Sequence, residues 1–387
     1  MPLGGTFTAF ASTTPGLETI LAGELAAIGA VPGRAEPGGI EFDATPSLLA
    51  RALLSLRTAH RITVRLATFH ARTFGELERH AATVPWTEFV AKGGAVHFRV
   101  TSKKSKLYHQ DAIAERLERA ALSASSGVTA VRAPSSAEAM EEDLERVPAM
   151  QRIVIRVMRD AVTLSADASG ALLHRRGYRQ AVAKAPLRET LAAALVIASG
   201  WHPEVPLLDP LCGSGTIAIE AAMIARRMVP GRARRFAAER WPGFGPIFEI
   251  ARREALAAEL AAASSVIIGR DRDAGAIDAA RSNAERAGVA ADVNFGLGAL
   301  SATPDDAAPG YVVTNPPYGT RIGERAKLRD LYATIGQLMR ARLPRSSLTM
   351  LTADRVLEGH TALAFDELFR TTNGGIPVHA VRAFGRS

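Results

Sequence analysis

The sequence predicts an α/β fold in which a parallel sheet binds a nucleotide-like ligand at the ends of its strands. Residues 205–208 form an apolar run typical of a buried strand, and the run stops at the Asp-Pro pair of residues 209–210. A glycine turn at residues 213–215 leads into the helical pattern of residues 217–222. This order of strand, glycine turn and helix binds nucleotide-like ligands at the carboxyl end of a parallel sheet. We expect the glycines to admit the ligand, because a Cβ would collide with it.

The glycine turn differs from the two commonest phosphate-binding motifs. Its spacing is not G-x-G-x-x-G and no Lys-Ser/Thr pair follows it, so neither a dinucleotide fingerprint nor a P-loop is predicted. An ordinary tight turn between a strand and a helix is the alternative interpretation.

Two further strands are predicted to end at the same edge. Residues 265–268 form a strand that leads to Asp271, and a carboxylate there binds ribose hydroxyls in Rossmann-like folds. Asp273 is expected to cap the helix of residues 274–286. Residues 311–313 form another strand, which Asn315-Pro316-Pro317-Tyr318 ends abruptly. Two prolines fix φ twice and remove two N–H donors, so this loop is stiff. A plain Asn-Pro turn is the alternative.

Composition favours a polyanionic partner in a reducing compartment. The 387 residues are enough for two or three domains, and the net charge of +8 with a pI of about 10.0 suits a nucleic acid. The single cysteine, Cys212, excludes internal disulfides and cysteine-cluster metal sites, which predicts a cytoplasmic location. We find neither a signal-peptide pattern nor an apolar run long enough to span a bilayer.

The first 65 residues predict a small α+β unit. Alternating apolar residues give a strand at 7–11, and helical spacing gives a helix at 17–28. A short strand at 38–42 and a helix starting near residue 47 complete this unit, which shows no catalytic set.

Residues 66–167 predict a second unit that carries a basic loop. A strand at 96–100 precedes this loop, a helix follows it, and residues 153–166 form a hairpin. The loop offers three lysines beside two aromatic rings as a candidate phosphate site: Lys103, Lys104, Lys106, Tyr108 and His109. An ordinary solvated loop is equally consistent with the charge.

Two more basic stretches flank the glycine turn. The segment before it contains His174, Arg175, Arg176, Tyr178, Arg179 and Lys184, which could contact backbone phosphates. Residues 226–241 combine five arginines near Phe236 with Arg240 and Trp241, and are a candidate for presenting RNA to the site.

Taken together, the D-P-L-C-G-S-G-T turn and the N-P-P-Y loop resemble the class I S-adenosylmethionine-dependent methyltransferases that modify exocyclic amines of nucleobases. The segments F-A-S-T-T-P-G-L-E, T-S-K-K-S-K-L-Y-H-Q-D and S-G-A-L-L-H-R-R-G-Y-R widen this to THUMP-domain RNA methyltransferases, and most nearly to bacterial 23S rRNA guanine-N2-methyltransferases. The resemblance implies a ferredoxin-like domain at 1–65, a THUMP RNA-binding domain at 66–167 and a Rossmann-like methyltransferase domain at 168–387. It also implies a seven-stranded sheet ending in an antiparallel hairpin, with a turn at residues 372–375.

The resemblance assigns site residues in three groups. The loop that would hold the target amine is Asn315, Pro316, Pro317 and Tyr318, with acceptors on the Asn315 side chain and the Pro316 carbonyl and with Tyr318 stacking on the extruded base. The S-adenosylmethionine site would comprise Pro186, Asp209, Pro210, Cys212, Gly213, Ser214, Gly215, Thr216, Asp271 and Asn315. RNA would contact Lys103, Lys104, Lys106, Tyr108, His109, Arg175, Arg176, Tyr178 and Arg179. No metal or covalent nucleophile is expected, since the sulfonium already activates the methyl group.

One position departs from the family pattern. An acidic residue that contacts the adenine amine should follow the strand at 292–297, and Ala299 stands there; Asp305 and Asp306 come later. The function expected is transfer of a methyl group to guanine N2, in 23S rRNA. The alternatives are a tRNA guanine-N2 or adenine-N6 methyltransferase, or an RNA-binding assembly factor without catalysis.

Overall fold

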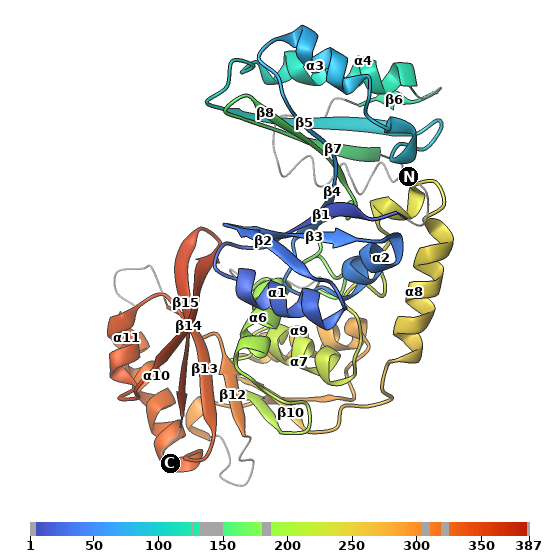
Figure 1. The fold of residues 1–387 in the computed structure, drawn as a ribbon. Coiled ribbons are helices and arrows are strands. Elements are labelled where there is room, and N and C mark those ends of the chain that lie inside the picture. Colours follow the sequence, from blue (N-terminus) through green and yellow to red (C-terminus); the bar gives the residue numbers. More distant parts are fainter. Residues whose placement is uncertain are drawn as a thin grey trace. The chain divides into compact units, whose positions relative to one another are not determined.

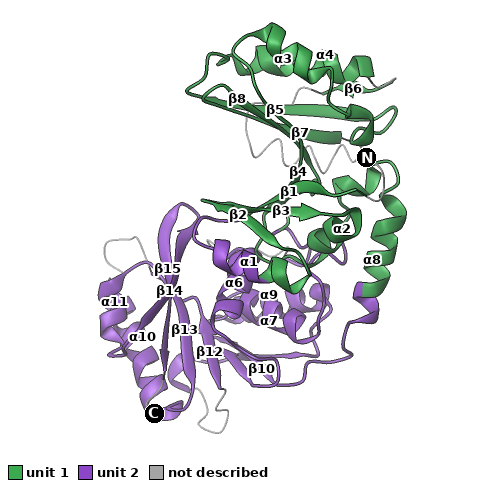
Figure 2. Ribbon diagram, in the orientation of Figure 1, with its two compact units in different colours: residues 1–12, 24–173, 234–254 green, residues 13–23, 174–233, 255–387 purple. Residues whose placement is uncertain are grey.

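The structure is a computed structural model that describes residues 5–124, 127–131, 150–179, 187–302, 310–318 and 325–384. The chain forms two compact units (Figure 2). Unit 1 comprises Met1–Ser12, Glu24–Leu173 and Arg234–Glu254, and unit 2 comprises Thr13–Gly23, His174–Ala233 and Ala255–Ser387.

The N-terminal half of the chain supplies the strands of an eight-stranded sheet in unit 1 (Figure 1). Its elements are β1 (Phe7–Ser12), α1 (Glu18–Ala27), β2 (Pro32–Glu36), β3 (Gly39–Ala44), α2 (Pro46–Ser55), β4 (Arg61–His70), α3 (Phe74–Ala81), β5 (Ala95–Lys103), α4 (Gln110–Ala124), β6 (Thr129–Ala130), β7 (Met150–Met158) and β8 (Ala161–Asp167). The sheet order is β2-β3-β1-β4-β8-β7-β5-β6.

Local chemistry explains where two of these helices begin. The Thr45 hydroxyl accepts a hydrogen bond from the Leu48 amide and caps α2, whose first residue is a proline. Thr73 and Glu76 form a capping box at the start of α3, each side chain accepting from the other residue's backbone N–H.

β4 joins two smaller folds into one sheet. The first four strands, with order β2-β3-β1-β4, have the topology of a ferredoxin-like domain. β4 pairs with β1 on one side and with β8 on the other, and residues 63–64 pair on both sides. The predicted domain boundary at 65/66 therefore lies inside a strand, and the division of residues 1–167 into two domains stays a prediction.

The rest of the chain builds the seven-stranded sheet of unit 2 with its helices, and the helix α8, most of which belongs to unit 1. Its elements are α6 (Glu189–Ala198), β9 (Leu207–Asp209), α7 (Thr216–Ala225), α8 (Gly245–Ala257), β10 (Ile267–Asp271), α9 (Ala274–Ala287), β11 (Val293–Leu297), β12 (Tyr311–Thr314), α10 (Arg325–Gln337), the π-helical turn η5 (Leu338–Arg342), β13 (Ser347–Thr352), α11 (Arg355–His360), β14 (Asp366–Asn373) and β15 (Ile376–Phe384).

The unit 2 sheet has the order β11-β10-β9-β12-β13-β15-β14, in which β15 alone runs opposite to the other strands. One core cluster places α6, α7 and α9 against one face, and a second places α10, η5 and α11 against the other. Figure 1 shows these helices on the two sides of the sheet. The predicted α/β class, with a Rossmann-like domain after α+β segments, is confirmed, as is the terminal hairpin.

Candidate active site at the strand ends of unit 2

Three predicted site residues meet at one edge of the seven-stranded sheet. β9 lies in the middle of the sheet and pairs in parallel with β10 and with β12. Asp209 ends β9, Asp271 ends β10 and Asn315 follows β12. The carboxyl ends of parallel strands lie at the same edge, so the fold brings these three positions together as the sequence predicted.

Two glycines with positive φ shape the turn between β9 and α7. Gly213 has a φ of 52° and Gly215 a φ of 83°, a left-handed backbone that L-residues rarely adopt. The Gly213 N–H donates to Asp271 Oδ2 at 2.9 Å, and the Gly215 N–H donates to the Cys212 carbonyl at 2.8 Å. The turn is thus tied to the end of β10 through one carboxylate.

The two glycines of the turn serve different purposes, which corrects the expectation that both make room for a ligand. A Cβ on Gly213 would meet nothing within 4 Å among the described atoms, so space is open there. A Cβ on Gly215 would lie 2.7 Å from the ring of Phe295, and one on Gly269 would lie 2.5 Å from the same ring. Gly215 and Gly269 are therefore required by the packing of Phe295 on β11.

Asp209 is a buried carboxyl group with defined partners. Its Oδ1 accepts hydrogen bonds from the Thr314 hydroxyl at 2.8 Å and from the Leu211 N–H at 3.2 Å. Burial raises its pKa to about 7, although both hydrogen bonds favour the charged form. Asp209 therefore joins the ends of β9 and β12 rather than projecting into solvent.

Asp271 is half-buried and held by backbone donors. Its Oδ2 accepts from Gly213 as described, and its Oδ1 accepts from the Asp273 N–H at 3.0 Å. Asp273 caps α9 by accepting from the N–H groups of residues 275 and 276, as predicted. A carboxylate fixed in this way at a strand end, with lone pairs to spare, suits the two hydroxyls of a ribose.

The Asn-Pro-Pro-Tyr loop presents an acceptor without a partner. Asn315 is half-buried, and its Oδ1 is shielded from solvent with no hydrogen bond to any described residue. Pro316 is buried and Pro317 is exposed. A buried, unsatisfied amide oxygen costs free energy, and a ligand that donates a hydrogen bond to Oδ1 of Asn315 would remove that cost.

Tyr318 is held at both ends of its side chain. The ring packs against the core cluster of the α6–α7–α9 face, and its hydroxyl accepts a hydrogen bond from Asn373 Nδ2 at 2.8 Å. Burial raises the pKa of Tyr318, so the hydroxyl stays protonated at neutral pH. Sequence reasoning assigned Asn373 only to a hairpin turn.

The remaining turn residues have structural surroundings. Cys212 is buried, and burial raises the pKa of its thiol, which keeps it an unreactive packing residue. Ser214 and Thr216 are buried, and Pro210 follows the last residue of β9. Pro186 lies outside the described residues, as do Asp305 and Asp306. Ala299 is exposed and comes two residues after the end of β11.

A series of hydrogen bonds through Asn283, a residue that matches the family pattern, supports the glycine turn. The buried Asn283 on α9 donates through Nδ2 to the Ser214 carbonyl at 3.0 Å, and its Oδ1 accepts from Arg286. Arg286 also donates to the Tyr178 carbonyl at 2.7 Å. The turn is thus connected to the segment that precedes α6.

Three of the four residues before α6 that were assigned to RNA are used within the fold, which corrects their assignment; Lys184 lies outside the described residues. Arg176 is buried and pairs with the buried Glu220 on α7 at 2.8 Å, and the Tyr178 hydroxyl donates to Glu220 at 2.9 Å. Arg179 is half-buried and donates to the Leu187 carbonyl at 2.7 Å. Arg175 is exposed. The sequence shows the positive charge of Arg176 but not the buried Glu220 carboxylate that pairs with it.

The basic stretch at residues 226–241 is used only in part within the fold, because Arg227, Arg232, Arg235 and Arg240 are exposed. Arg226 donates to two backbone carbonyls and pairs with Asp292 at 3.3 Å. Arg234 donates to the carbonyls of residues 171 and 172, and Trp241 is buried. The expected role of this stretch in presenting RNA stays a prediction, which only the exposed arginines could fulfil.

The lysine loop in unit 1 is exposed, and its backbone is hydrogen-bonded to the turn between β7 and β8. Lys103, Lys104, Lys106, Tyr108 and His109 all face solvent. Asp160, in the tight turn between β7 and β8, accepts from the Lys106 N–H at 2.8 Å and pairs with Arg72 at 3.2 Å. This predicted group therefore stays together as a cationic surface with two exposed rings.

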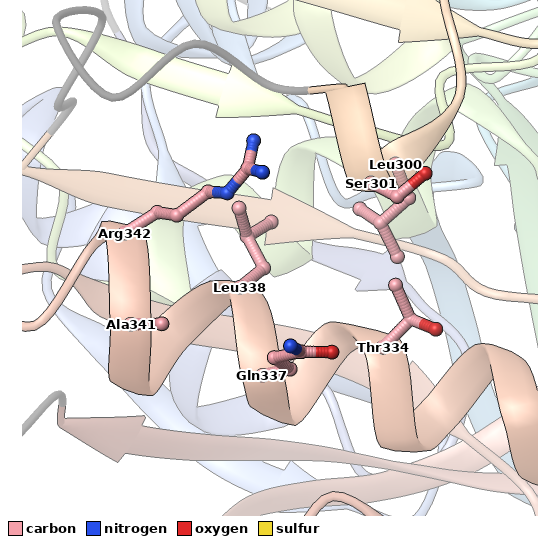
Figure 3. Close-up of a pocket in the computed structure, with 7 residues that line it drawn as sticks. All are labelled: Leu300, Ser301, Thr334, Gln337, Leu338, Ala341 and Arg342. Carbon is pink, nitrogen blue, oxygen red and sulfur yellow. The ribbon is translucent and has the colours of Figure 1, made fainter.

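Other features add no further site. A small cavity of about 90 Å³ lies between the segment after β11 and the end of α10, and Figure 3 shows Leu300 and Ser301 facing Thr334 and Leu338 there. None of the predicted site residues lines it. Within the described ranges, no group of His, Cys, Asp or Glu side chains could hold a metal ion, and no helix is long and apolar enough to cross a membrane.

Comparison with known proteins identifies relatives for both units. Residues 176–381 match the family described as RMKL-like, methyltransferase domain, and residues 8–63 match the RlmL ferredoxin-like domain. A ribosomal RNA large subunit methyltransferase K/L of Syntrophotalea carbinolica is 36% identical over 95% of this chain, which spans 52% of that protein. A putative RNA methyltransferase of Synechocystis is 32% identical over 95% of this chain and 94% of its own.

A solved structure shares the whole fold. The crystal structure of a putative methyltransferase complexed with SAH has a TM-score of 0.84, with 29% sequence identity over 99% of both chains. The matched methyltransferase domain covers more than half of this chain and contains the three strand ends that carry Asp209, Asp271 and Asn315. The chain belongs to the RMKL-like methyltransferase family.

Proposed function

We propose that this protein is an RNA methyltransferase that transfers a methyl group from S-adenosylmethionine to the exocyclic N2 of a guanine in 23S ribosomal RNA. The family and the geometry of the strand ends support methyl transfer. The relative named as a ribosomal RNA large subunit methyltransferase supports the RNA class, although this chain spans about half of its length.

The unpartnered Oδ1 of Asn315 carries the proposal. An exocyclic amine is a poor nucleophile, because its lone pair is delocalised into the purine ring. The Asn315 oxygen and the Pro316 carbonyl accept the two amine hydrogens, which localises the lone pair on nitrogen and stabilises the positive charge that develops there. The two prolines hold both acceptors in place before the substrate binds, so little reorganisation accompanies the reaction.

The residues of the turn fit the proposed methyl donor. S-adenosylmethionine, when bound, supplies a methyl group already activated by its sulfonium. The open space above Gly213 admits the donor's backbone-like methionine part, and Asp271 binds the ribose hydroxyls. The aromatic face of Tyr318 stacks on the base extruded from the RNA, an interaction worth about 1–3 kcal/mol.

The test of this proposal is methyl transfer with labelled S-adenosylmethionine to purified rRNA and tRNA, followed by nucleoside analysis. N2-methylguanosine in rRNA is the expected product. The same product in tRNA, or N6-methyladenosine, would replace our substrate with one of the alternatives. No incorporation into any RNA, including rRNA from unmodified ribosomes, would overturn the enzyme function and favour an RNA-binding factor.

Asn315→Ala tests the assigned residue. Removing a preorganised polar group of this kind costs about 10²–10³-fold in rate, so transfer should fall by at least that factor. Affinity for S-adenosylhomocysteine, measured by calorimetry, should stay near the parental value, because Asn315 is one of several residues assigned to the donor and acts chiefly on the target amine. Asn294→Ala, which removes an exposed asparagine on β11, is the matched control. Parental rates in Asn315→Ala would show that another group binds the amine.

The cationic loop of unit 1 is the proposed RNA contact. Neutralising Lys103, Lys104 and Lys106 together should weaken RNA binding and make it less dependent on salt, because fewer counterions are released. Filter binding at several salt concentrations measures both effects. Replacing Lys92, a lysine elsewhere in unit 1, is the control; an unchanged salt dependence in the triple variant would place the RNA elsewhere.

A further inference from the structure

The turn between β14 and β15 does not use the side chain of Asn373, the last residue of β14. Asn373 pairs with Ile376 across the hairpin, so the turn itself is Gly374-Gly375. Both glycines have positive φ, 58° and 83°, as a tight hairpin turn requires. Asn373 is therefore not needed for the left-handed backbone that asparagine often supplies in turns.

The Asn373 side chain instead reaches the loop that follows β12. Its Nδ2 donates to the Tyr318 hydroxyl at 2.8 Å, a contact between residues 55 positions apart. Both side chains are half-buried, so solvent competes weakly for this hydrogen bond. Prolines fix the backbone before Tyr318, and the hydrogen bond acts at the far end of its ring. The ring plane is thereby held from both ends.

We propose that Asn373 is a positioning residue that holds the ring of Tyr318 ready to stack on the target base. This inference rests on the proposed function. An aromatic face that is already oriented loses little conformational freedom when the base arrives, and preorganisation of this kind raises affinity. The hairpin at the C-terminal edge of the sheet thus takes part in binding the substrate base.

The kinetic test compares Asn373→Ala, Asn373→Asp and Tyr318→Phe with the parent. One hydrogen bond contributes about 1 kcal/mol, so Asn373→Ala and Tyr318→Phe should each lower kcat/KM for RNA about five- to tenfold. Asn373→Asp should recover much of the loss, because the Tyr318 hydroxyl can donate to the carboxylate. Affinity for S-adenosylhomocysteine should not change. Thr372→Ala, at the exposed neighbouring position, is the control and should behave as the parent.

Non-additivity separates this role from a general weakening of the hairpin. Adding Asn373→Ala to Tyr318→Phe should have no further effect, since both changes remove the same hydrogen bond. Losses that multiply in the double variant would overturn the proposal. So would parental kcat/KM in Asn373→Ala, and this outcome would leave the methyltransferase function standing.

A measurement without RNA keeps the inference separate from the proposed function. The chain has five tyrosines, so fluorotyrosine labelling gives few ¹⁹F resonances, and Tyr318→Phe identifies the one from Tyr318. Asn373→Ala should shift and narrow that resonance as the ring becomes freer, whereas Thr372→Ala should not. An unchanged Tyr318 resonance would overturn the proposal, whether or not the parent methylates RNA.

Discussion

Asp209 and Asn315 are polar side chains at the same sheet edge with opposite hydrogen-bonding states. Asp209 is satisfied by Thr314 and Leu211, whereas Oδ1 of Asn315 has no partner within the described part of the chain. A fully bonded group stabilises the local backbone, and an unbonded acceptor has capacity left for a ligand. The difference separates the residue that builds the site from the residue that would act on the substrate.

Asp209 makes the stability of the protein depend on pH. Its pKa rises from 3.8 to about 7 on folding, so the folded state binds the proton more tightly than the unfolded state. The free energy of unfolding therefore falls as pH rises between these values. Asp209→Asn keeps an oxygen for Thr314 and Leu211 but removes this titration.

We expect the thermal midpoint of Asp209→Asn, relative to the parent, to increase as pH rises from about 4 to about 7 and to level off above that. Thermal unfolding of both proteins in matched buffers, without added ligand, measures the difference. A constant difference across this pH range would show that Asp209 titrates as an ordinary exposed carboxyl group.

Asn283 offers a second residue-level prediction, this time for the donor site. Asn283→Asp keeps the acceptor for Arg286 but loses the N–H that holds the Ser214 carbonyl. We expect affinity for S-adenosylhomocysteine to fall about tenfold, in line with loss of one buried hydrogen bond. Calorimetry measures it, with the exposed Asn294→Asp as the control. Equal affinities in the parent and Asn283→Asp would mean that the turn keeps its shape alone.

The sequence predicts those candidate site residues whose pattern is local. A few neighbouring residues are enough to predict each of them: the glycine turn, the carboxylate at the end of β10 and the Asn-Pro-Pro-Tyr loop. The contacts that Asn283, Asn373 and Glu220 make with Ser214, Tyr318 and Arg176 were not predicted, because these partners lie tens of positions away and no spacing rule connects them. The same limit led Arg176 to be assigned to RNA when its charge is neutralised inside the fold.

At the level of elements, the ring of Phe295 fixes how β10, β11 and the start of α7 pack. Of the two glycines that face the ring, Gly215 has a positive φ and Gly269 does not, so at Gly269 only lack of space forbids a side chain. Gly269→Ala should therefore destabilise unit 2 by about 1–3 kcal/mol, the usual cost of overpacking.

A second change tests the cause of that loss. Phe295→Leu replaces the ring with a smaller side chain. The double variant of Gly269→Ala and Phe295→Leu should therefore recover part of the stability that Gly269→Ala loses. Gly23→Ala, in α1 with nothing within 4 Å of the new Cβ, should instead be neutral or stabilising by up to about 1 kcal/mol. Denaturant unfolding measures the free energy of unfolding of Gly269→Ala, Phe295→Leu, the double variant and Gly23→Ala. Equal losses in the single and double variants would assign the cost to something other than Phe295.

Elements with a clear period were predicted well and those without one were not. The hairpin of β14 and β15 was predicted by its Asn-Gly-Gly turn, and β15 spans the expected residues 376–384. Helix α8 was not predicted, because it buries only Phe248 and exposes Ile250 and Leu256, which leaves no apolar stripe. β4 was missed because only the first part of the strand alternates between buried and partly exposed residues.

On the scale of the whole molecule, the two compact units are not continuous stretches of the chain. Residues 13–23 lie near the N-terminus but belong to unit 2. Leu17 is fully buried in the core cluster that also contains Leu191 and Phe369, and a Cβ on Gly16 would lie 1.6 Å from the Arg370 carbonyl oxygen. Composition and periodicity cannot reveal such membership, because it depends on contacts between distant segments.

Two leucines of equal burial, Leu17 and Leu25, test this division. Leu17 lies in unit 2, and Leu25, two turns further along the same helical segment, lies in unit 1. Each substitution by alanine should cost about 2–5 kcal/mol. Hydrogen exchange should show Leu17→Ala loosening α6 and β14, and Leu25→Ala loosening β1 to β3. The same pattern of loosening in both variants would show that the two units unfold as one.

The strand β4 has a consequence for how this protein can be recombined with its relatives. Residues 63–64 pair with β1 on one side and with β8 on the other. A chimaera joined at this point would take the two halves of β4 from different parents. Each half must then pair in the correct register with strands that come from the other parent. A one-residue mismatch would turn every later side chain of the strand to the opposite face. Viable chimaeras should therefore inherit the stretch from β1 to β8 from a single parent, with their junctions in the loops outside it.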